Sequence, residues 1–253
     1  MPSSEFLTIA LPVWNEELVL EKNVRAIFHA CQNFWPDRIV HIVIADNDSR
    51  DRTPDIATRL ATEIPSVHSI HLPEPGKGGA IRKAWELFPA RISCFMDIDL
   101  STDLFALPHL VSAIEDGADV AYGSRIAPDA HVSRSWQRHI VSFGYRSAVK
   151  FFTGFSDDVA CGFKAISENV MQSVVPEITD THFAFDREIV LRAHAHGLKL
   201  TAIPVAWVEA RDVRRSSTVH LASVALRDIR HLRDLQKKLR GARSDLRRSD
   251  LGA

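Results

Sequence analysis

Two carboxylates, Asp97 and Asp99, follow an apolar run in the stretch "CFMDIDLSTD" and are separated by a single residue. Alternate residues of a strand point to the same side, so both carboxylates would face one site. Like charges that close need a cation, and hard oxygen ligands suit Mg²⁺ or Mn²⁺, which take one or two carboxylates together with substrate phosphates. The alternative is that they cap the next helix, but Ser101 and Asp103 are better placed for that because helical spacing begins at Leu104.

The Gly-rich turn "PGKGGA" carries Lys77 and opens a helical pattern. It is not a P-loop, because no Ser or Thr follows Gly78 and His71 stands where the first Gly would be. It is not a dinucleotide fingerprint either, because Ile81 replaces the third Gly. What remains is a lysine at a helix N-terminus, where anions are favoured, with a plain turn as the alternative.

A third polar stretch, "IADNDSRDRT", places Asp46 and Asn47 directly after an apolar run. Short polar side chains at that position can hydrogen-bond a base or a ribose. The alternative is an Asx turn that caps the next helix, which we expect Asp51 and Thr53 to form. Asp46 and Asn47 lie closer to the end of the strand, and both interpretations stay open for them.

The elements that must position these residues alternate along the first half of the chain. The expected strands cover 6–13, 38–46, 67–72, 92–98 and 118–124. The expected helices lie near 16–34, 53–63, 78–88 and 103–115. Apolar strands separated by helices indicate βαβ units, and therefore an α/β fold whose mostly parallel sheet is covered on both faces. Ligands of such sheets bind outside the carboxyl ends of the strands, where the three polar stretches fall.

The second half of the chain is less regular. We expect a loop at 126–139, helices at 140–152 and 185–196, and strands at 161–167 and 198–209. From Thr218 a long helical pattern runs to about Arg240. The pattern divides the chain into a main domain, 1–217, and a basic amphipathic helix with a tail, 218–253.

Composition limits the class of protein. The 253 residues are 45% hydrophobic and 25% charged, which suits one sizeable core rather than a disordered or fibrous chain. A net charge of −1 argues against general nucleic-acid binding. The three cysteines form neither a metal-ligand pair nor a disulfide framework, which fits a reducing cytosol. We expect neither a signal peptide nor a membrane-spanning run, and so a cytoplasmic protein.

Seven motifs, taken in order, resemble the family 2 glycosyltransferases of GT-A fold, in particular the polyprenyl-phosphate (dolichyl-phosphate) mannose and glucose synthases. They are "PVWNE" (12–16), "DNDSRDRT" (46–53), "GKGGA" (76–80), "DID" (97–99), "GSR" (123–125), "DVACGF" (158–163) and "FAFDRE" (183–188). Trp14 replaces the family's Tyr, and Asn47 and Asp48 depart from its second motif. Each motif alone is a weak signal, but seven in one order, from residue 8 to about 217, are specific.

The resemblance implies a donor of the UDP-glucose or GDP-mannose type and a Mg²⁺ or Mn²⁺ ion held by the D-x-D motif. It makes Asp99 the main metal ligand and places Asp97 near both metal and sugar. Ser101 stands where some members offer a third ligand. The other residues that match the nucleotide-sugar pocket are Pro12, Asn15, Glu16, Asp46, Asn47 and Lys77.

The resemblance also implies a polyprenyl or dolichyl phosphate as acceptor. Such a phosphate is mostly dianionic at pH 7, since its second pKa is about 6, and it needs cations rather than a strong base. Arg125, Arg138 and Arg215 match arginines that bind phosphate in these synthases, and a guanidinium suits phosphate better than an ammonium does. Surface ion pairs are the alternative for each of them.

Asp186 has two interpretations. In relatives that glycosylate a hydroxyl, an Asp near this point is the general base, so a hydroxyl of a saccharide or small molecule is the alternative acceptor. Otherwise Asp186 caps a helix that ends with Gly197 in the C′ position. A catalytically inactive nucleotide-sugar binder is the non-enzyme alternative, and the intact Asp97/Asp99 pair speaks against it.

The C-terminal pattern is amphipathic and basic. A helix of this kind can lie on the inner face of an anionic membrane and bring the enzyme to a lipid acceptor. Packing on the catalytic domain or on a partner subunit explains the same pattern, and homo-oligomerisation stays open. The apolar positions are Leu221, Val224, Ala225, Ile229, Leu232, Leu235 and Leu239.

Overall fold

A computed structural model describes residues 6–133, 136–208, 230 and 232–239, with the backbone alone for 136–141. The strands are β1 (Phe6–Val13), β2 (Ile39–Asn47), β3 (Val67–Leu72), β4 (Ile92–Met96), β5 (Val120–Ser124), β6 (His131–Ser133), β7 (Phe163–Ser167), β8 (Leu200–Pro204) and β9 (Ala206–Val208). The α-helices are α1 (Leu20–Phe34), α2 (Thr53–Glu63), α3 (Lys77–Leu87), α4 (Leu107–Glu115), α5 (Trp136–Thr153), α6 (Glu168–Ser173) and α7 (Phe185–Ala195). Two 3₁₀ turns, Leu104–Ala106 and Val175–Glu177, complete the named elements.

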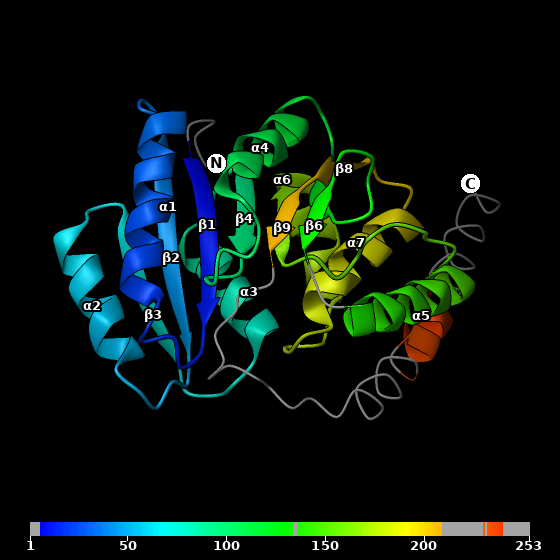
Figure 1. Ribbon diagram of the computed structural model, residues 1–253, viewed down its shortest axis with the longest axis horizontal. Coiled ribbons are helices and arrows are strands. Elements are labelled where there is room, and N and C mark those ends of the chain that lie inside the picture. The colour runs from blue at the N-terminus through cyan, green and yellow to red at the C-terminus, as the bar shows by residue number, and fades with distance from the viewer. Residues whose placement is uncertain (1–5, 134–135, 209–229, 231, 240–253) are drawn as a thin grey trace, which may run out of the picture.

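A seven-stranded sheet in the order β3-β2-β1-β4-β7-β5-β8 forms the centre of the molecule (Figure 1). Its neighbouring strands are parallel except for β7, which runs antiparallel to both β4 and β5. The parallel register places Val13 of β1 opposite Asp46 of β2. The carboxyl ends of the first four strands therefore share one edge, and the polar stretches that follow them meet there. The expected α/β fold with a mostly parallel sheet is confirmed.

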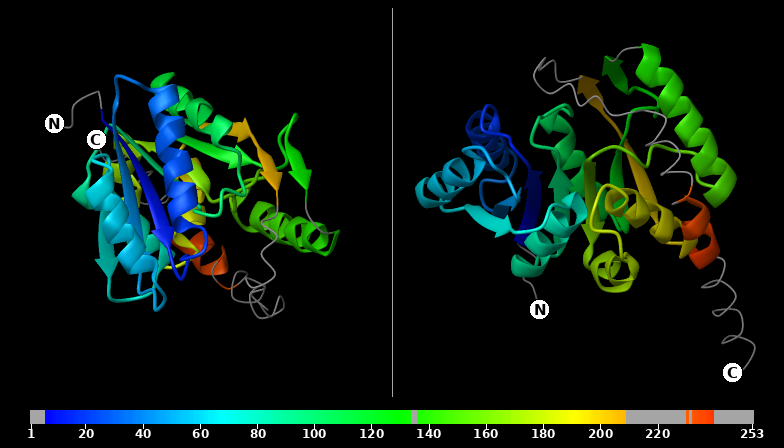
Figure 2. Two further views of the ribbon diagram at one scale, coloured as in Figure 1. Left: turned by 60° about the vertical axis from the view of Figure 1, so that its left-hand side comes forward. Right: turned by 90° about the horizontal axis from the view of Figure 1, so that it is seen from below.

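Helices cover both faces of the sheet because its strands are apolar on both sides. Leu7, Ile9 and Leu11 of β1 pack in one core with α1, α2 and α4, whereas Ala10 faces a second core. That second core also receives α3, α6 and α7. Figures 1 and 2 show the resulting three layers. Buried parallel strands read as continuous apolar runs for this reason.

Several boundaries differ from the sequence-based expectation. The acidic strand ends at Met96, two residues early, and the expected loop at 126–139 contains β6 and the start of α5. The expected strand at 198–209 is interrupted at Val205, and its second half, β9, leaves the main sheet to pair with β6. The differences at β6 and β9 concern strands of three residues, for which hydrophobic periodicity carries little information.

The C-terminal helix is described only at residue 230 and over 232–239. Leu232, Leu235 and Leu239 are buried in the same core as α7. The guanidinium of Arg233 lies 5.7 Å from the ring of Phe152 on α5. This segment therefore packs on the main domain, one of the alternatives for the basic helix. The rest of the expected helix, 218–229, lies outside the described residues, and the boundary at 217 stays a prediction.

In the described part of the chain, no helix has the length and the apolar content that crossing a membrane requires.

Candidate active site

The acidic pair lies in a turn that follows β4. Asp97 and Asp99 come after the last residue of the strand, and Leu100 takes a φ of 52° within the turn. The Oδ1 atom of Asp99 accepts a hydrogen bond of 3.0 Å from the backbone nitrogen of Ser101. The two carboxylates do share one site, as predicted, but the predicted cause, alternation along a strand, was wrong. The turn, rather than the strand, brings both side chains to one pocket.

Helix capping is the task of Asp103, as expected. Its Oδ1 accepts a hydrogen bond of 2.9 Å from the backbone nitrogen of Phe105 at the start of the 3₁₀ turn. Ser101, which was expected to share that task, instead lines the pocket beside Asp99. The capping alternative for Asp97 and Asp99 has no support, because Asp103 fills that position.

The pocket encloses about 100 Å³ and is lined mostly by polar surface. Its lining residues are Met96, Asp97, Asp99, Ser101, Thr102, Arg125, Ala160, Gly162, Phe163 and Trp207. Gly162 is required there, because a Cβ atom at this position would lie 2.0 Å from Oδ2 of Asp97. The backbone nitrogen of Asp97 also donates to the carbonyl oxygen of Gly162 at 3.1 Å. Close contact with Gly162, in the loop between α5 and β7, therefore fixes the position of Asp97.

Two lysines and two aspartates form a charged cluster beside the pocket. Lys77 Nζ lies 2.7 Å from Oδ1 of Asp97 and 3.5 Å from Oδ2 of Asp186. Lys164, whose side chain is fully buried, lies 4.0 Å from the same oxygen of Asp186. The ring centre of Phe95 lies 5.5 Å from the amine of Lys77 and 5.3 Å from that of Lys164. The cluster thus joins the acidic turn to α7.

The two lysines of this cluster differ in their electrostatics. Burial would lower the pKa of Lys77, but Asp97 and Asp186 outweigh it and raise that pKa above its ordinary value. Burial dominates for Lys164 and lowers its pKa, although Asp186 opposes the shift. Lys77 is therefore the firmly charged member of the pair.

Asp186 does not cap α7. The helix begins at Phe185 with Ala184 as its N-cap, so Asp186 lies in the first turn with its side chain 9% exposed and facing the lysines. The capping interpretation was wrong, because Asp180 accepts hydrogen bonds from the nitrogens of His182 and Ala184 instead. The expected helix end is confirmed, since Gly197 follows the C-cap with a φ of 73°.

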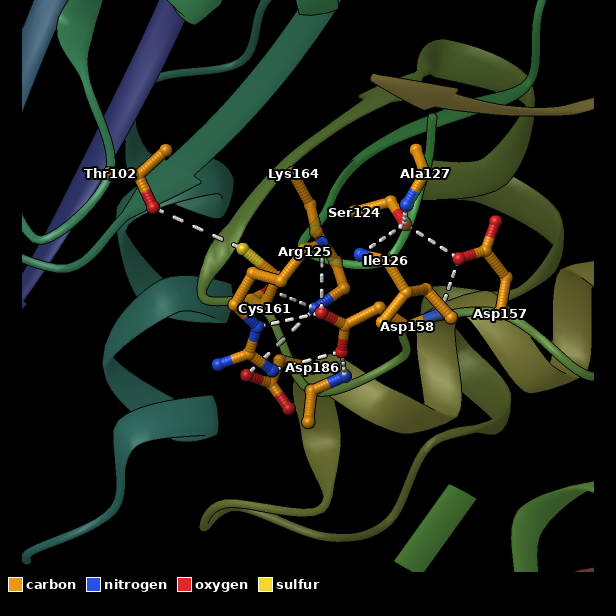
Figure 3. A network of polar contacts seen from close by, with 11 residues as sticks. Thr102, Ser124, Arg125, Ile126, Ala127, Asp157, Asp158, Cys161, Lys164 and Asp186 are labelled. Atoms are coloured by element: carbon orange, nitrogen blue, oxygen red, sulfur yellow. Dashed lines mark hydrogen bonds and ion pairs between the residues drawn. The ribbon is translucent and has the colours of Figure 1, made fainter. Parts of the chain in front are cut away.

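Arg125, at the end of β5, makes a double hydrogen bond to Asp158. Its Nε donates to Oδ2 at 2.6 Å and its Nη2 donates to Oδ1 at 2.9 Å (Figure 3). The neighbouring Asp157 accepts from Ser124 Oγ at 2.7 Å and from Tyr122 Oη at 2.9 Å. Hydrogen bonding to Arg125 outweighs the effect of burial and lowers the pKa of Asp158. Two consecutive aspartates therefore hold two residues of β5 and Arg125, which directly follows the strand.

The expected nucleotide-binding residues lie on the same edge of the sheet, around the ends of β1 and β2. Asp46 accepts from the backbone nitrogen of Ser49 at 3.3 Å, and its Oδ2 lies 2.6 Å from His71 Nδ1. Asn47 Oδ1 accepts from the backbone nitrogen of Gly76 at 2.5 Å, which ties the end of β2 to the Gly-rich turn. Lys77 directly follows Gly76 and contacts Asp97, so these hydrogen bonds link the ends of β1 and β2 to the acidic turn.

The first motif of the chain lies against the second. Asn15, with a φ of 55°, accepts a hydrogen bond from the nitrogen of Arg50 at 2.8 Å. Glu16 donates its backbone nitrogen to Thr53 Oγ1 at 2.7 Å. Pro12 pairs with Ala45 in the sheet.

Asp51 behaves as predicted in this region. It accepts a hydrogen bond of 2.9 Å from the backbone nitrogen of Thr53, the first residue of α2. Thr53, which was expected to share this task, instead accepts from the backbone nitrogen of Glu16.

Two of the three predicted phosphate-binding arginines lie outside the described side chains. Arg138 belongs to the first turn of α5, where the backbone alone is described, and Arg215 lies in the undescribed segment 209–229. Arg125 lines the pocket. Sequence reasoning assigned no role to Lys164, Trp207 or His71. Asp158 belongs to the motif "DVACGF" (158–163), but no sequence pattern indicates that it bonds Arg125, 33 residues away.

The sheet order with one antiparallel strand, and the acidic turn at its carboxyl edge, define the class as a GT-A glycosyltransferase fold. A solved structure of glucosyl-3-phosphoglycerate synthase from Mycobacterium tuberculosis, in complex with Mn²⁺, UDP and glucosyl-3-phosphoglycerate, matches 90% of this chain and 80% of its own. The TM-score is 0.66 at 15% sequence identity, a similarity of fold alone. The model of the family "Glycosyl transferase family 2" matches residues 8–189, so the chain belongs to glycosyltransferase family 2.

Relatives with assigned names agree with this family. The chain is 32% identical over 212 residues to glycosyltransferase AglD of Haloferax volcanii, matching 82% of this chain but 34% of that protein. It is 28% identical over 216 residues to polyprenol monophosphomannose synthase of Mycolicibacterium smegmatis, matching 82% and 79%. It is 25% identical over 229 residues to dolichyl-phosphate beta-glucosyltransferase of Saccharomyces cerevisiae, matching 81% and 67%. The chain thus spans about a third of AglD and most of the second relative.

Proposed function

We propose that this chain transfers a hexose from a nucleotide sugar to a polyprenyl or dolichyl phosphate, in a single displacement that inverts the anomeric centre. The observation that carries the proposal is the pocket itself, which Asp97 and Asp99 line together with Arg125. A site for a cation and a site for an anion therefore lie within one small volume. The names of two relatives, a polyprenol and a dolichol synthase, support the choice of acceptor.

The residues present fit a divalent metal ion. Asp97 and Asp99 offer hard oxygen ligands at the pocket, and Ser101 lies beside them. Among the described residues, no cluster of three or more His, Cys, Asp or Glu side chains is arranged to bind a metal. Two carboxylates completed by diphosphate oxygens and water are typical of Mg²⁺ and Mn²⁺. The bound ion would supply Lewis-acid neutralisation of the diphosphate leaving group.

The donor is held by the edge of the sheet that carries the first motifs. Pro12, Asn15, Glu16, Asp46 and Asn47 surround the nucleotide in this proposal. Lys77 lies at the N-terminus of α3, where the helix favours an anion, and it contacts Asp97. Its ammonium is therefore placed to contact the diphosphate.

The acceptor oxygen is the nucleophile. An oxygen of the phosphate dianion forms a bond to the anomeric carbon, the bond from that carbon to the diphosphate oxygen breaks, and the nucleoside diphosphate leaves with the electron pair. No proton has to be removed, because the phosphate is already ionised at pH 7. Arg125 binds the acceptor phosphate, and Arg138 and Arg215 are proposed to join it.

The position of Asp186 favours this acceptor over a hydroxyl. A general base must reach the proton that it removes, directly or through one water. Asp186 does not line the pocket, and its carboxylate is directed at Lys77 and Lys164. A hydroxyl-glycosylating enzyme with Asp186 as base remains the second candidate.

Peripheral membrane contact is part of the proposal. The apolar face of the segment 232–239 is buried on the domain, so this part of the basic helix would meet an anionic surface with its charged side. The exposed basic residues there are Arg230, Arg233, Lys237 and Lys238.

Two variants separate the candidates. Asp99→Ala should lower transfer to polyprenyl phosphate by about 100-fold or more in Mg²⁺ or Mn²⁺. Full activity of this variant would show that Asp99 is not needed to bind the metal ion. Asp186→Asn should lower transfer to polyprenyl phosphate by less than about tenfold. If Asp186→Asn abolished transfer, and the wild type also used a saccharide hydroxyl, the second candidate would replace the first.

A further inference from the structure

Arg125 is held along one edge of its guanidinium by a single carboxylate. Besides the two side-chain bonds to Asp158, its backbone nitrogen donates to Oδ2 of the same residue at 3.2 Å. Asp158 is 3% exposed and also accepts from the nitrogen of Ala160 at 3.1 Å. The carboxylate is therefore fixed by its own loop. It fixes the backbone and the side chain of Arg125 together.

A tryptophan stacks on the same guanidinium. The Cζ atom of Arg125 lies 5.6 Å from the ring centre of Trp207, within the range of a cation–π contact. Trp207 lies in the short strand β9, whose position is set by a bridge to Thr102 and by a 2.8 Å hydrogen bond from Val208 to the carbonyl of Ser101. The ring therefore belongs to the wall that also carries the acidic turn.

One nitrogen of Arg125 is left for a ligand. Nε and Nη2 are engaged by Asp158, and no acceptor among the described residues bonds Nη1. Nη1 points away from Asp158 (Figure 3), and Arg125 lines the pocket with Asp97 and Asp99. We propose that Asp158 and Trp207 are positioning residues, which hold Arg125 so that Nη1 meets one oxygen of a phosphomonoester on the acceptor.

This inference rests on the proposed function for the class of acceptor and adds two residues to its machinery. A free arginine side chain has several rotatable bonds, and ordering it on binding costs affinity. An arginine that a bidentate carboxylate and an aromatic ring already hold in place loses less conformational entropy when it binds a ligand. Mobility of Arg125 should therefore weaken acceptor binding and leave donor binding unchanged.

Asp157 provides a matched control. It belongs to the same loop and also bonds the end of β5, but through Ser124 and Tyr122 rather than through Arg125. A purely structural role of the loop would make Asp157→Asn and Asp158→Asn equivalent in acceptor KM. A positioning role affects acceptor KM in Asp158→Asn alone.

The experiment measures KM and kcat for donor and acceptor in the full chain with Mn²⁺. The two acceptors are a polyprenyl phosphate in detergent and 3-phosphoglycerate, which share the phosphomonoester and differ in its source. Asp158→Asn should raise acceptor KM by about tenfold, with kcat and donor KM changed by less than about threefold. Trp207→Leu should raise acceptor KM by about fivefold, and Asp157→Asn by less than about twofold.

Each outcome decides the inference. Equal acceptor KM in Asp158→Asn and Asp157→Asn, or a donor KM that rises in parallel, would overturn it. If Asp158→Asn does not fold, Trp207→Leu alone decides, because it leaves no buried charge unpaired. If the wild type uses only 3-phosphoglycerate, the proposal of a lipid acceptor is wrong. The KM values of the Asp158→Asn and Asp157→Asn variants for 3-phosphoglycerate would then test whether Asp158 positions Arg125. A wild type that neither uses nor binds a phosphomonoester, by calorimetry, overturns the inference.

Discussion

Lys77 connects the two sides of the charged cluster. Its ammonium contacts Asp97 on the pocket side and Asp186 on the α7 side, and only 14% of its side chain is exposed. In the proposed reaction this ammonium moves part of its interaction from Asp97 to the donor diphosphate. A cation already next to the acidic turn would limit repulsion between Asp97 and the phosphates as the donor enters.

Lys77→Met should therefore weaken donor binding. We expect donor KM to rise by about tenfold with acceptor KM little changed, because a charge-assisted contact to the diphosphate is lost. Lys83→Met is the matched control, since Lys83 lies in the same helix with its side chain half exposed and pairs only with Glu86 among the described residues. Steady-state kinetics on both variants tests this. A donor KM that is equal in the two variants would remove Lys77 from the donor site.

The bond between Arg125 and Asp158 predicts an acid dependence of stability. The pKa of Asp158 is held below its ordinary value of 3.8 in the folded state, so the folded protein binds fewer protons there than the unfolded chain. The stabilisation is therefore complete above pH ~4 and is lost as the pH falls through the folded-state pKa.

We expect Asp158→Asn to lower the free energy of unfolding by about 3 kcal/mol at pH 7, because it leaves a largely buried guanidinium without its partner. The difference from the wild type should shrink as the pH falls below about 4. Urea unfolding followed by circular dichroism from pH 3 to pH 7 measures it. A difference that stays constant over this range would show that the ion pair does not stabilise the fold.

At the scale of elements, the loop between α5 and β7 determines the shape of the acidic site. Gly162 lies directly against the carboxylate of Asp97, and Asp157 and Asp158 hold the end of β5. These contacts join three strands that are neighbours in the sheet, β4, β7 and β5. The loop can therefore alter catalysis without contributing a metal ligand.

Gly162→Ala should displace Asp97 and lower transfer by about 100-fold, since misplacement by about 1 Å has effects of that size. Its melting temperature should change little if the carboxylate can rotate away. Gly144→Ala in α5 is the control, because a Cβ atom there meets no atom within 4 Å and alanine favours a helix. Transfer assays with thermal melts test both variants. Full activity of Gly162→Ala would contradict the proposed position of Asp97.

The sequence predicted the long apolar strands of this fold well. The predicted 6–13 and 67–72 agree with β1 and β3, because apolar runs bounded by polar residues define both ends. The end of β4 was misplaced, since Ile98 is buried and extends the apolar pattern through the turn. The pairing of β6 with β9 was missed, because a strand of three residues has no detectable period.

The candidate site was predictable in its residue types but not in its contacts. Spacing alone indicated that Asp97 and Asp99 share one site, although through a different local structure. The contact between Lys77 and Asp186 joins residues 109 positions apart, and no local pattern indicates it. Burial of Lys164 is equally invisible in the sequence, because lysine is mostly exposed in proteins.

At the scale of the whole molecule, parallel strand order places the residues of the proposed site on one edge of the sheet. The antiparallel β7 brings Gly162 beside the acidic turn, and β9 leaves the sheet to cover Arg125 with Trp207. The C-terminal segment 232–239 packs in the second core, with α3, α6 and α7, and does not line the pocket. Donor, metal and acceptor phosphate would therefore meet in one place.

Transfer of labelled sugar to a lipid phosphate tests the proposed activity directly. The full chain is incubated with UDP-glucose or GDP-mannose and a polyprenyl phosphate in detergent, with the matching polyprenol as control. We expect a labelled lipid-phosphate sugar with one of the donors, in Mg²⁺ or Mn²⁺, and a loss of transfer of about 100-fold or more in EDTA. Transfer to the polyprenol at the same rate, transfer undiminished by EDTA, or no labelled lipid from either donor would contradict the proposed activity.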